Sequence, residues 1–318
     1  MNAIGIGPGH GLTRPSRRPA IDVARGLALV AMAAYHGSWD ATYFGLAGFD
    51  LLGDPLWLAA RTVILSSFLL LAGIGLVLAT GGGIDAGRFL RRFGRVAAAA
   101  AAVSAASYAL FPDSPIFFGV LHHIAVASVI GLAFVRLPAV VTLAVAAAAV
   151  LVGTTQGFPL FDNPWLRWIG LTSVAPDSND FVPLLPWIGG VLAGIGLGRL
   201  WPGLGEGVRV TGRAGRLLAF GGRHSLAVYL LHQPLLFAIA WAAAQLMPTE
   251  TLAIRGFQAS CVASCERAGV ARATCTANCG CVQSELARNG LWEGYVANRL
   301  SERDQRGLQA AVAACSKP

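Results

Sequence analysis

The chain has 318 residues, of which 55% are hydrophobic and only 13% are charged, and its mean hydropathy is +0.61. Soluble globular domains usually carry about 25% charged residues, so this composition excludes that class and indicates a helical protein that crosses a membrane several times. The formal net charge of +8 comes from arginines that lie between the apolar stretches. This distribution is typical of membrane topology signals and argues against binding of nucleic acid.

The chain starts with a Gly-, Pro- and Arg-containing segment, residues 1–20, that lacks the apolar core of a cleaved signal peptide. The apolar stretches after it predict an all-α fold. We expect a polytopic transmembrane helical bundle of about seven spans over residues 21–247, followed by a small disulfide-stapled helical tail over 248–318. The predicted spans are residues 23–40, 57–79, 95–111, 117–135, 137–154, 183–200 and 224–247.

Arginines indicate which side of the membrane is cytoplasmic. They collect before the first span, between the second and third spans and between the sixth and seventh, and these places fall on one side if the spans alternate. Most aspartates fall on the other side. Because positive residues remain in the cytoplasm, we expect a cytoplasmic N-terminus and an extracytoplasmic tail after residue 247.

All six cysteines lie in this tail, which agrees with an oxidising, extracytoplasmic location. The first four have the spacing C-x3-C, nine residues, C-x3-C, and residues four apart share one face of a helix. A turn at Gly269 then predicts an antiparallel pair of short helices joined by disulfides. The expected pairs are Cys261–Cys279, Cys265–Cys275 and Cys281–Cys315.

Other arrangements of the cysteines stay open at this point, since six cysteines allow 15 pairings. A zinc site is the rival interpretation, but the C-x2-C spacing of common zinc modules is absent, and we expect no metal. A redox role has only the C-G-C at Cys279–Cys281 in its favour. Further along, "SERD" has the pattern of a helix N-cap and predicts a last helix from Ser301.

Ionisable residues inside membrane spans are costly and by default suggest a functional site. His36 and Asp40 lie four residues apart near the outer end of the first span, so they share one helical face if the helix continues. His122 and His123 lie near the outer end of the fourth span, where adjacent side chains face different ways and one is expected to be structural. The outer entry of the sixth span adds Asp177, Asp180 and Trp187, and the seventh span adds His224, His232 and Gln233.

Each of these residues also has a simpler interpretation. Histidines at span ends, such as His224, are commonly interfacial, and Asp177 and Asp180 suit a solvated loop. The set as a whole is harder to dismiss, because four separate outer segments supply groups that can face one cavity. We therefore expect a functional site on the extracytoplasmic side.

Four motifs carry a resemblance to a known family. In "DVARGLALVAMAAYH", ten residues separate Arg25 from His36, and Asp22 precedes the arginine by three positions. "FGVLHHIAVAS", "DFVPLLPWIGGVLAGIGLG" and "GRHSLAVYLLHQPLL" follow in order. Together they resemble the bacterial relatives of heparan-α-glucosaminide N-acetyltransferase, within the wider superfamily of membrane acyltransferases that acetylate envelope sugars. The resemblance covers about residues 19–247 and not the tail.

The resemblance implies transfer of an acetyl group from cytoplasmic acetyl-CoA to an amine or hydroxyl of an extracytoplasmic sugar. It places the chain in the bacterial inner membrane with a periplasmic C-terminus. The expected partners are membrane lipid and an envelope sugar or glycan, and a homodimer is possible. Acyl transfer needs a base near neutral pH, for which histidine is the natural residue. We expect His36 as base or acetyl carrier, Asp40 as its support, and His122 or His123 as the next catalytic candidates.

The phosphates of CoA match the planar donors of arginine. Arg25 is the first candidate because it lies within the first span beside Asp22, and the eleven helical steps to His36 cover roughly 16 Å, within reach of a pantetheine arm. The other donor-binding candidates are Arg88, Arg91, Arg92, Arg213, Arg216 and Arg223. The acceptor-binding candidates are Asp177, Asp180, Trp187, His232 and Gln233.

Two other functions compete with acyl transfer. A membrane carrier or flippase for a small anion or a lipid-linked sugar also suits paired histidines and a span that contains Pro234, although no convincing inverted repeat supports transport. A structural membrane anchor for the tail leaves the histidines unexplained.

Overall fold

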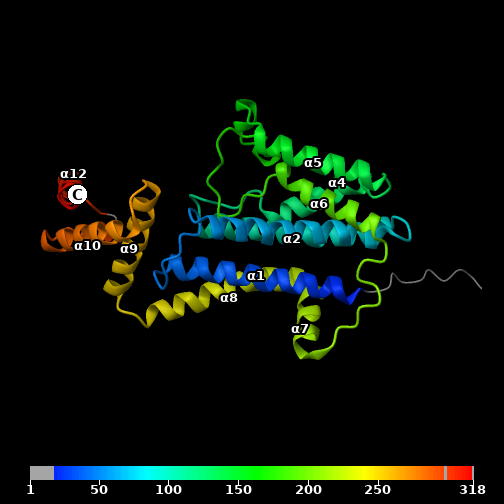
Figure 1. Ribbon diagram of the computed structural model, residues 1–318, viewed down its shortest axis with the longest axis horizontal. Coiled ribbons are helices and arrows are strands. Elements are labelled where there is room, and N and C mark those ends of the chain that lie inside the picture. The colour runs from blue at the N-terminus through cyan, green and yellow to red at the C-terminus, as the bar shows by residue number, and fades with distance from the viewer. Residues whose placement is uncertain (1–17, 297–298, 317–318) are drawn as a thin grey trace, which may run out of the picture. The chain divides into compact units, whose positions relative to one another are not determined.

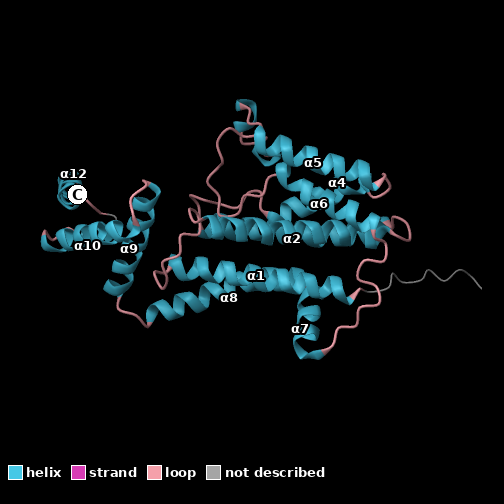
Figure 2. Ribbon diagram, viewed as in Figure 1, coloured by secondary structure: helices cyan, strands magenta, loops and turns pink. Residues whose placement is uncertain are grey.

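The structure is a computed structural model that describes residues 18–296 and 299–316, and within these ranges every regular element is a helix (Figures 1 and 2). The chain forms two compact units. One holds the residues up to Leu27 and Leu65–Leu226, and the other holds Ala28–Ile64 and the residues from Ala227 onward. Most of the predicted N-terminal segment, residues 1–17, lies outside the described residues.

Each predicted span corresponds to one helix, so the all-α fold class is confirmed. Three of these helices, α2, α3 and α8, are long and apolar enough to cross a membrane, and α4, α5 and α6 are apolar but shorter. That all seven cross the membrane stays a prediction. The seven helices are α1 (Pro19–Tyr43), α2 (Pro55–Thr80), α3 (Ala86–Leu110), α4 (Val120–Phe134), α5 (Ala139–Thr155), α6 (Leu184–Leu200) and α8 (Ser225–Gln245).

Helix α3 starts earlier than predicted, at Ala86 rather than near residue 95. Asp85 explains the difference, because its side chain accepts a hydrogen bond from the backbone N–H of Arg88 at 2.9 Å and caps the helix. The arginines of "RFLRRFGR" were expected in a loop, and that was wrong. They lie instead in the first turns of α3.

Helix α7 (Gly212–Arg223) was not predicted at all. Its sequence alternates basic and apolar residues, so it looked like a charged loop between two spans. Its C-terminal end packs closely on α1 within the first unit, because a Cβ at Gly222 would collide with the carbonyl of Asp22. Arg213, Arg216 and Arg223, also expected in a loop, are exposed residues of this helix.

The first unit is held together by close contacts between helices. Helix α5 packs along α6, and α4 also contacts α6. Helices α2 and α6 approach until their backbones touch, since a Cβ at Gly73 would collide with the Val191 carbonyl and a Cβ at Gly194 with the Leu70 carbonyl. Small residues allow this approach, which is the usual means of packing helices in membranes.

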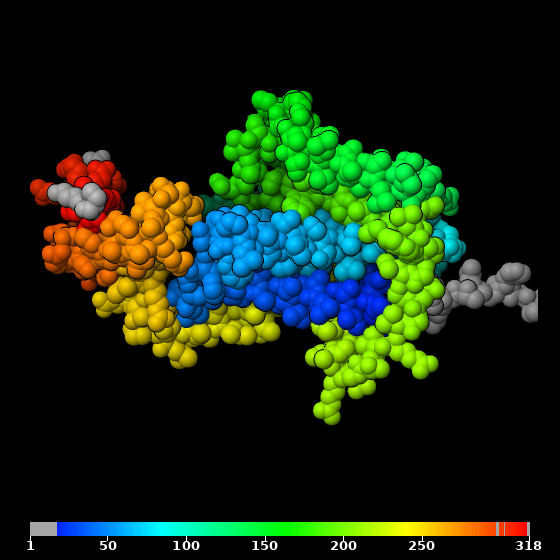
Figure 3. Space-filling view, viewed as in Figure 1, coloured from blue at the N-terminus to red at the C-terminus, as the bar shows by residue number. Residues whose placement is uncertain are grey.

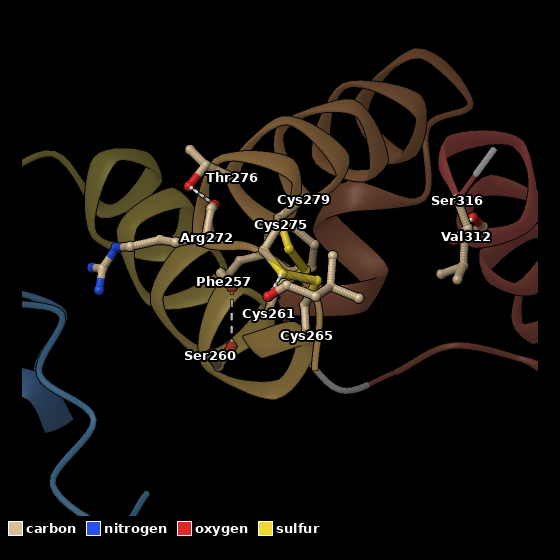
Figure 4. The surroundings of a disulfide bond; sticks show 11 residues. Phe257, Ser260, Cys261, Cys265, Arg272, Cys275, Thr276, Cys279, Val312 and Ser316 are labelled. Atoms are coloured by element: carbon tan, nitrogen blue, oxygen red, sulfur yellow. Dashed lines mark hydrogen bonds between the residues drawn. A yellow bond between two sulfur atoms is a disulfide. The ribbon is translucent and has the colours of Figure 1, made fainter. Parts of the chain in front are cut away.

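The tail consists of α9 (Thr249–Arg267), α10 (Arg272–Arg288), α11 (Trp292–Val296) and α12 (Glu302–Cys315), seen in orange to red in Figure 3. Gly269 has a φ of +85° and makes the turn between α9 and α10. The side chains of the first four cysteines meet between these two helices (Figure 4). The predicted connectivity is confirmed, with disulfides Cys261–Cys279, Cys265–Cys275 and Cys281–Cys315.

A small hydrophobic core supports the disulfides. Phe257 from α9, Leu286 from α10 and Ala311 from α12 are buried together, with Trp292 packed against them. The predicted cap of the last helix is confirmed, because the Ser301 side chain accepts a hydrogen bond from the Asp304 backbone N–H. The tail therefore has a core of its own in addition to its covalent cross-links.

Peptide mapping of the non-reduced protein tests this tail. We expect three intrachain bridges with the connectivity given above and no bound zinc, because every cysteine sulfur is used in a disulfide. Reduced and alkylated protein serves as the control. Free thiols throughout, or stoichiometric zinc by elemental analysis, would contradict the disulfide assignment.

Candidate functional site

Two histidines face each other in the second unit. His36 of α1 and His232 of α8 are joined by a contact of 2.8 Å between His36 Nδ1 and His232 Nε2. Their rings are stacked, with centroids 5.0 Å apart and an angle of 23° between the planes. His232 is buried and His36 is half-buried. The sequence singled out both residues but assigned His232 to the acceptor rather than to His36.

Asp40 and Gln233 make a second connection one helical turn along α1. The Gln233 amide donates to Asp40 Oδ1 at 2.8 Å, and Asp40 is fully buried. Within the part of the chain that the structure describes, Asp40 Oδ2 and Gln233 Oε1 have no hydrogen-bond partner. Asp40 was expected to support His36, but its hydrogen bond goes to Gln233, and the partner of His36 is His232.

A cavity of about 400 Å³ lies in the second unit, where the C-terminal ends of α1 and α8 meet the start of α9. Its lining combines the ring of Tyr43 with polar groups from Thr42, Gln245 and Thr249. Trp39 stacks on Tyr43 with ring centroids 5.2 Å apart. The sequence does not predict this cavity, although the four-residue spacing of Trp39 and Tyr43 does predict that the two rings are neighbours.

His122 and Asp180 serve the N-terminus of α4 in the first unit. His122 Nδ1 accepts a hydrogen bond from the Gly119 backbone N–H at 3.2 Å, and its Nε2 contacts Ser104 Oγ at 3.3 Å. Asp180 Oδ2 accepts from the Val120 N–H at 3.0 Å. Both side chains therefore satisfy helix-terminal donors that have no partner within the helix.

His123 differs from its neighbour. It is fully buried, its Nδ1 lies 3.1 Å from the Pro183 carbonyl, and its Nε2 has no partner among the described residues. The two other acceptor candidates of this unit lie elsewhere on its surface: Asp177 is exposed in a loop, and Trp187 is half-buried near the start of α6.

A pair of guanidinium groups lies in the first unit. Arg25 Nη1 is 3.7 Å from Asp22 Oδ1, and Arg25 Nη2 is 3.4 Å from the Leu71 carbonyl. Beside Gly75, a Cβ would lie 2.5 Å from Arg25 Nη2 and 3.7 Å from Arg92 Nη2, so the two arginines are close neighbours. Arg25 and Arg92 are half-buried, whereas the other five arginine candidates are exposed.

These features define a class of protein before any comparison: a helical membrane protein with paired imidazoles, a buried carboxylate and two neighbouring half-buried arginines. The family described as heparan-alpha-glucosaminide N-acetyltransferase, catalytic, matches residues 17–234. The chain therefore belongs to this family of membrane acetyltransferases. No match to the chain is found among curated proteins or among solved structures.

The matched segment includes His36, Asp40, His232 and Gln233 and ends before the cysteine-rich tail. Among the described residues, no group of three or more His, Cys, Asp or Glu side chains is arranged to hold a metal ion. The site brings together imidazole, carboxylate and amide groups.

The structural role of His122 predicts a stability effect. His122→Ala removes the acceptor of the Gly119 N–H, so thermal unfolding in detergent should show a loss of roughly 1 kcal/mol, typical of a lost helix cap. His224→Ala is the matched control, because His224 is exposed at the end of α7 and contacts only the local Phe220 carbonyl and ring among the described residues. An unchanged midpoint for His122→Ala together with lost acetyl transfer would return His122 to the catalytic candidates.

Proposed function

We propose that this protein moves an acetyl group from cytoplasmic acetyl-CoA to an amine or hydroxyl of an extracytoplasmic sugar, with His36 at the reacting centre. The observation that carries the proposal is the partly buried contact between His36 and His232 within the segment that matches an acetyltransferase family. A polar pair of this kind is costly inside a membrane and is found there chiefly where it has a function.

His36 provides the base that the reaction requires. An amine or hydroxyl must lose a proton as it attacks the thioester carbonyl, and an imidazole is suited to accept it near neutral pH. The new C–N or C–O bond forms as the C–S bond breaks, and the proton goes finally to the CoA thiolate. If the acetyl group rests on His36 between two half-reactions, the same nitrogen acts as nucleophile.

The cavity at the ends of α1 and α8 is the acceptor site of this proposal, and it lies further along α1 than His36, which is not among its lining residues. The ring of Tyr43, stacked on Trp39, offers an apolar face to the C–H face of a sugar ring. Thr42, Gln245 and Thr249 supply hydroxyl and amide groups for sugar hydroxyls. A cavity of about 400 Å³ is within the usual size range for a small ligand.

Arg25 and Arg92 form the acetyl-CoA binding site of this proposal. Two guanidinium groups side by side repel each other, and Asp22 compensates one charge at most. A phosphate group between them would relieve the repulsion and receive charge-assisted hydrogen bonds. Helix α1 carries both Arg25 and His36, so one helix links the proposed donor anchor to the proposed reacting centre.

The topology of the proposal follows from the distribution of charge and cysteine. Residues 21–247 form the acyltransferase domain with about seven spans and a cytoplasmic N-terminus, and residues 248–318 lie in the periplasm. Three disulfides in the tail support an oxidising compartment on that side. The bacterial inner membrane is the membrane that meets these conditions.

Arginine variants test the donor site. Arg25→Ala and Arg92→Ala should each weaken acetyl-CoA binding roughly 10- to 100-fold, because each removes hydrogen bonds to a charged group. Arg88→Ala is the matched control on α3, since Arg88 is exposed and paired with Asp85. Calorimetry at low and high salt should show weaker binding as salt rises. Equal CoA affinity in all three variants would return these arginines to the role of topology signals.

Variants of His36 test the reacting centre. His36→Ala should still bind acetyl-CoA, but transfer of labelled acetyl to amino sugars should fall roughly 10²–10⁴-fold, the usual effect of losing a general base. The acid limb of the pH profile should disappear from its residual activity. Asp40→Asn keeps the shape and should cause a smaller loss.

Normal turnover in both variants would contradict the assignment and move it to His123, a fully buried histidine whose Nε2 has no hydrogen-bond partner among the described residues. A wild-type protein that moves labelled sugar or anion across vesicles, and acetylates none of it, would instead support the carrier alternative.

A further inference from the structure

The hydrogen-bond chain that starts at His36 continues past His232 to the backbone. His232 Nδ1 lies 2.6 Å from the carbonyl oxygen of Tyr229, one turn earlier on α8. A carbonyl oxygen only accepts hydrogen bonds, so His232 Nδ1 carries a proton. The second nitrogen of His232, Nε2, lies 2.8 Å from His36 Nδ1.

The neutral form of this chain has one direction. When His232 Nδ1 carries the proton and the ring is neutral, His232 Nε2 is an acceptor. His36 Nδ1 must then be the donor, and His36 Nε2 keeps its lone pair. The pair therefore presents one basic nitrogen, at His36, whose ring also lies beside the Gln233 side chain, and holds the other three ring nitrogens in hydrogen bonds.

The reverse direction requires a charged ring. In this direction His36 Nδ1 is the acceptor. His232 would then carry protons on both nitrogens and be an imidazolium at rest. A buried cation needs an anion as its partner. Asp40, the buried carboxylate of this cluster, is bonded through Oδ1 to Gln233 rather than to either histidine in the described residues. The neutral direction is the favoured one.

We infer that His232 is a positioning residue that holds His36 with Nε2 as its basic nitrogen and takes up a proton from His36 during acetyl transfer. This inference rests on the proposed function. In the step, the acceptor N–H or O–H proton moves to His36 Nε2, and the Nδ1 proton of His36 moves to His232 Nε2. The positive charge then lies on His232, where Nδ1–H still donates to the Tyr229 carbonyl. The Nε2 proton of His36 then goes to the CoA thiolate, and the proton on His232 Nε2 returns to His36 Nδ1.

This arrangement explains why an imidazole occupies the position where hydrolytic triads place a carboxylate. A carboxylate orients its histidine and stabilises the charged ring. His232 orients in the same way through one acceptor nitrogen. It differs because it is neutral at rest, so the buried site carries no fixed charge from it.

Nitrogen-15 NMR of histidine-labelled protein tests the orientation without any need for activity. The signal lost in His36→Ala identifies His36. We expect wild-type His36 to be the Nδ1–H tautomer, and His232→Gln to retain that tautomer because the amide oxygen still accepts. His232→Phe removes the acceptor and should shift His36 toward the Nε2–H tautomer. A wild-type His36 with the proton on Nε2 would overturn the inference.

Kinetics test the proton transfer. His232→Gln keeps the orientation but cannot take a proton, so kcat should fall at least tenfold with acetyl-CoA affinity unchanged. Because His232 acts through His36, adding His232→Gln to His36→Ala should cause no further loss. Wild-type turnover in His232→Gln, or a further loss in the double variant, would overturn the transfer step. If wild-type protein forms no acetylated product, the proposed function fails, and the NMR tautomer still decides the orientation.

Discussion

His36 and Asp40 of α1 each have a polar partner on α8, and such partners are needed wherever a polar side chain is kept from water. The partner of His36 is His232, 196 residues away in the sequence, and that of Asp40 is Gln233, 193 residues away. These two neighbouring residues of α8 connect to two residues one turn apart on α1. The alignment of the two helices is thereby determined, and so is the position of the cavity where both helices end.

The same constraint makes the unpartnered atoms informative. Asp40 Oδ2, Gln233 Oε1 and His123 Nε2 are buried without a hydrogen bond among the described residues. Each such atom costs about 1–3 kcal/mol when no partner is present. Departures of this kind from full hydrogen bonding are expected at functional sites. The neighbouring guanidinium groups of Arg25 and Arg92 are a second example, since a bound anion would reduce their mutual repulsion.

Features that depend on periodicity along the chain could be predicted from the sequence. The helical pattern placed all seven apolar helices, and the spacing of four residues between cysteines, with Gly269 at the turn, gave the disulfide connectivity. The start of α3 at Asp85 was missed because a cap depends on one side chain, and hydropathy averages over many. Helix α7 was missed for the same reason, because its arginines lower the average hydropathy of a segment that also has a short apolar face.

Partnerships between distant residues could not be predicted. The spacing of His36 and Asp40 suggested that they bond each other, as side chains four apart on a helix often do. The competing partners come from α8, and only the packing of α1 on α8 decides between them. His122 and Asp180 were equally ambiguous, because the same residue types cap helices and bind substrates. The structure separates them by the backbone N–H groups that they accept.

The central claim is that the acetyl group crosses from one side of the membrane to the other through this protein. Sealed vesicles containing the purified protein test it most directly, with labelled acetyl-CoA outside and a panel of amino and neutral sugars inside. Neither reactant crosses a lipid bilayer at a useful rate, so acetylated sugar should accumulate inside vesicles with wild-type protein and not in those with His36→Ala. Labelled product that forms only after detergent mixes the two compartments would contradict transmembrane transfer, and no labelled product in either condition would contradict acetyl transfer to these sugars.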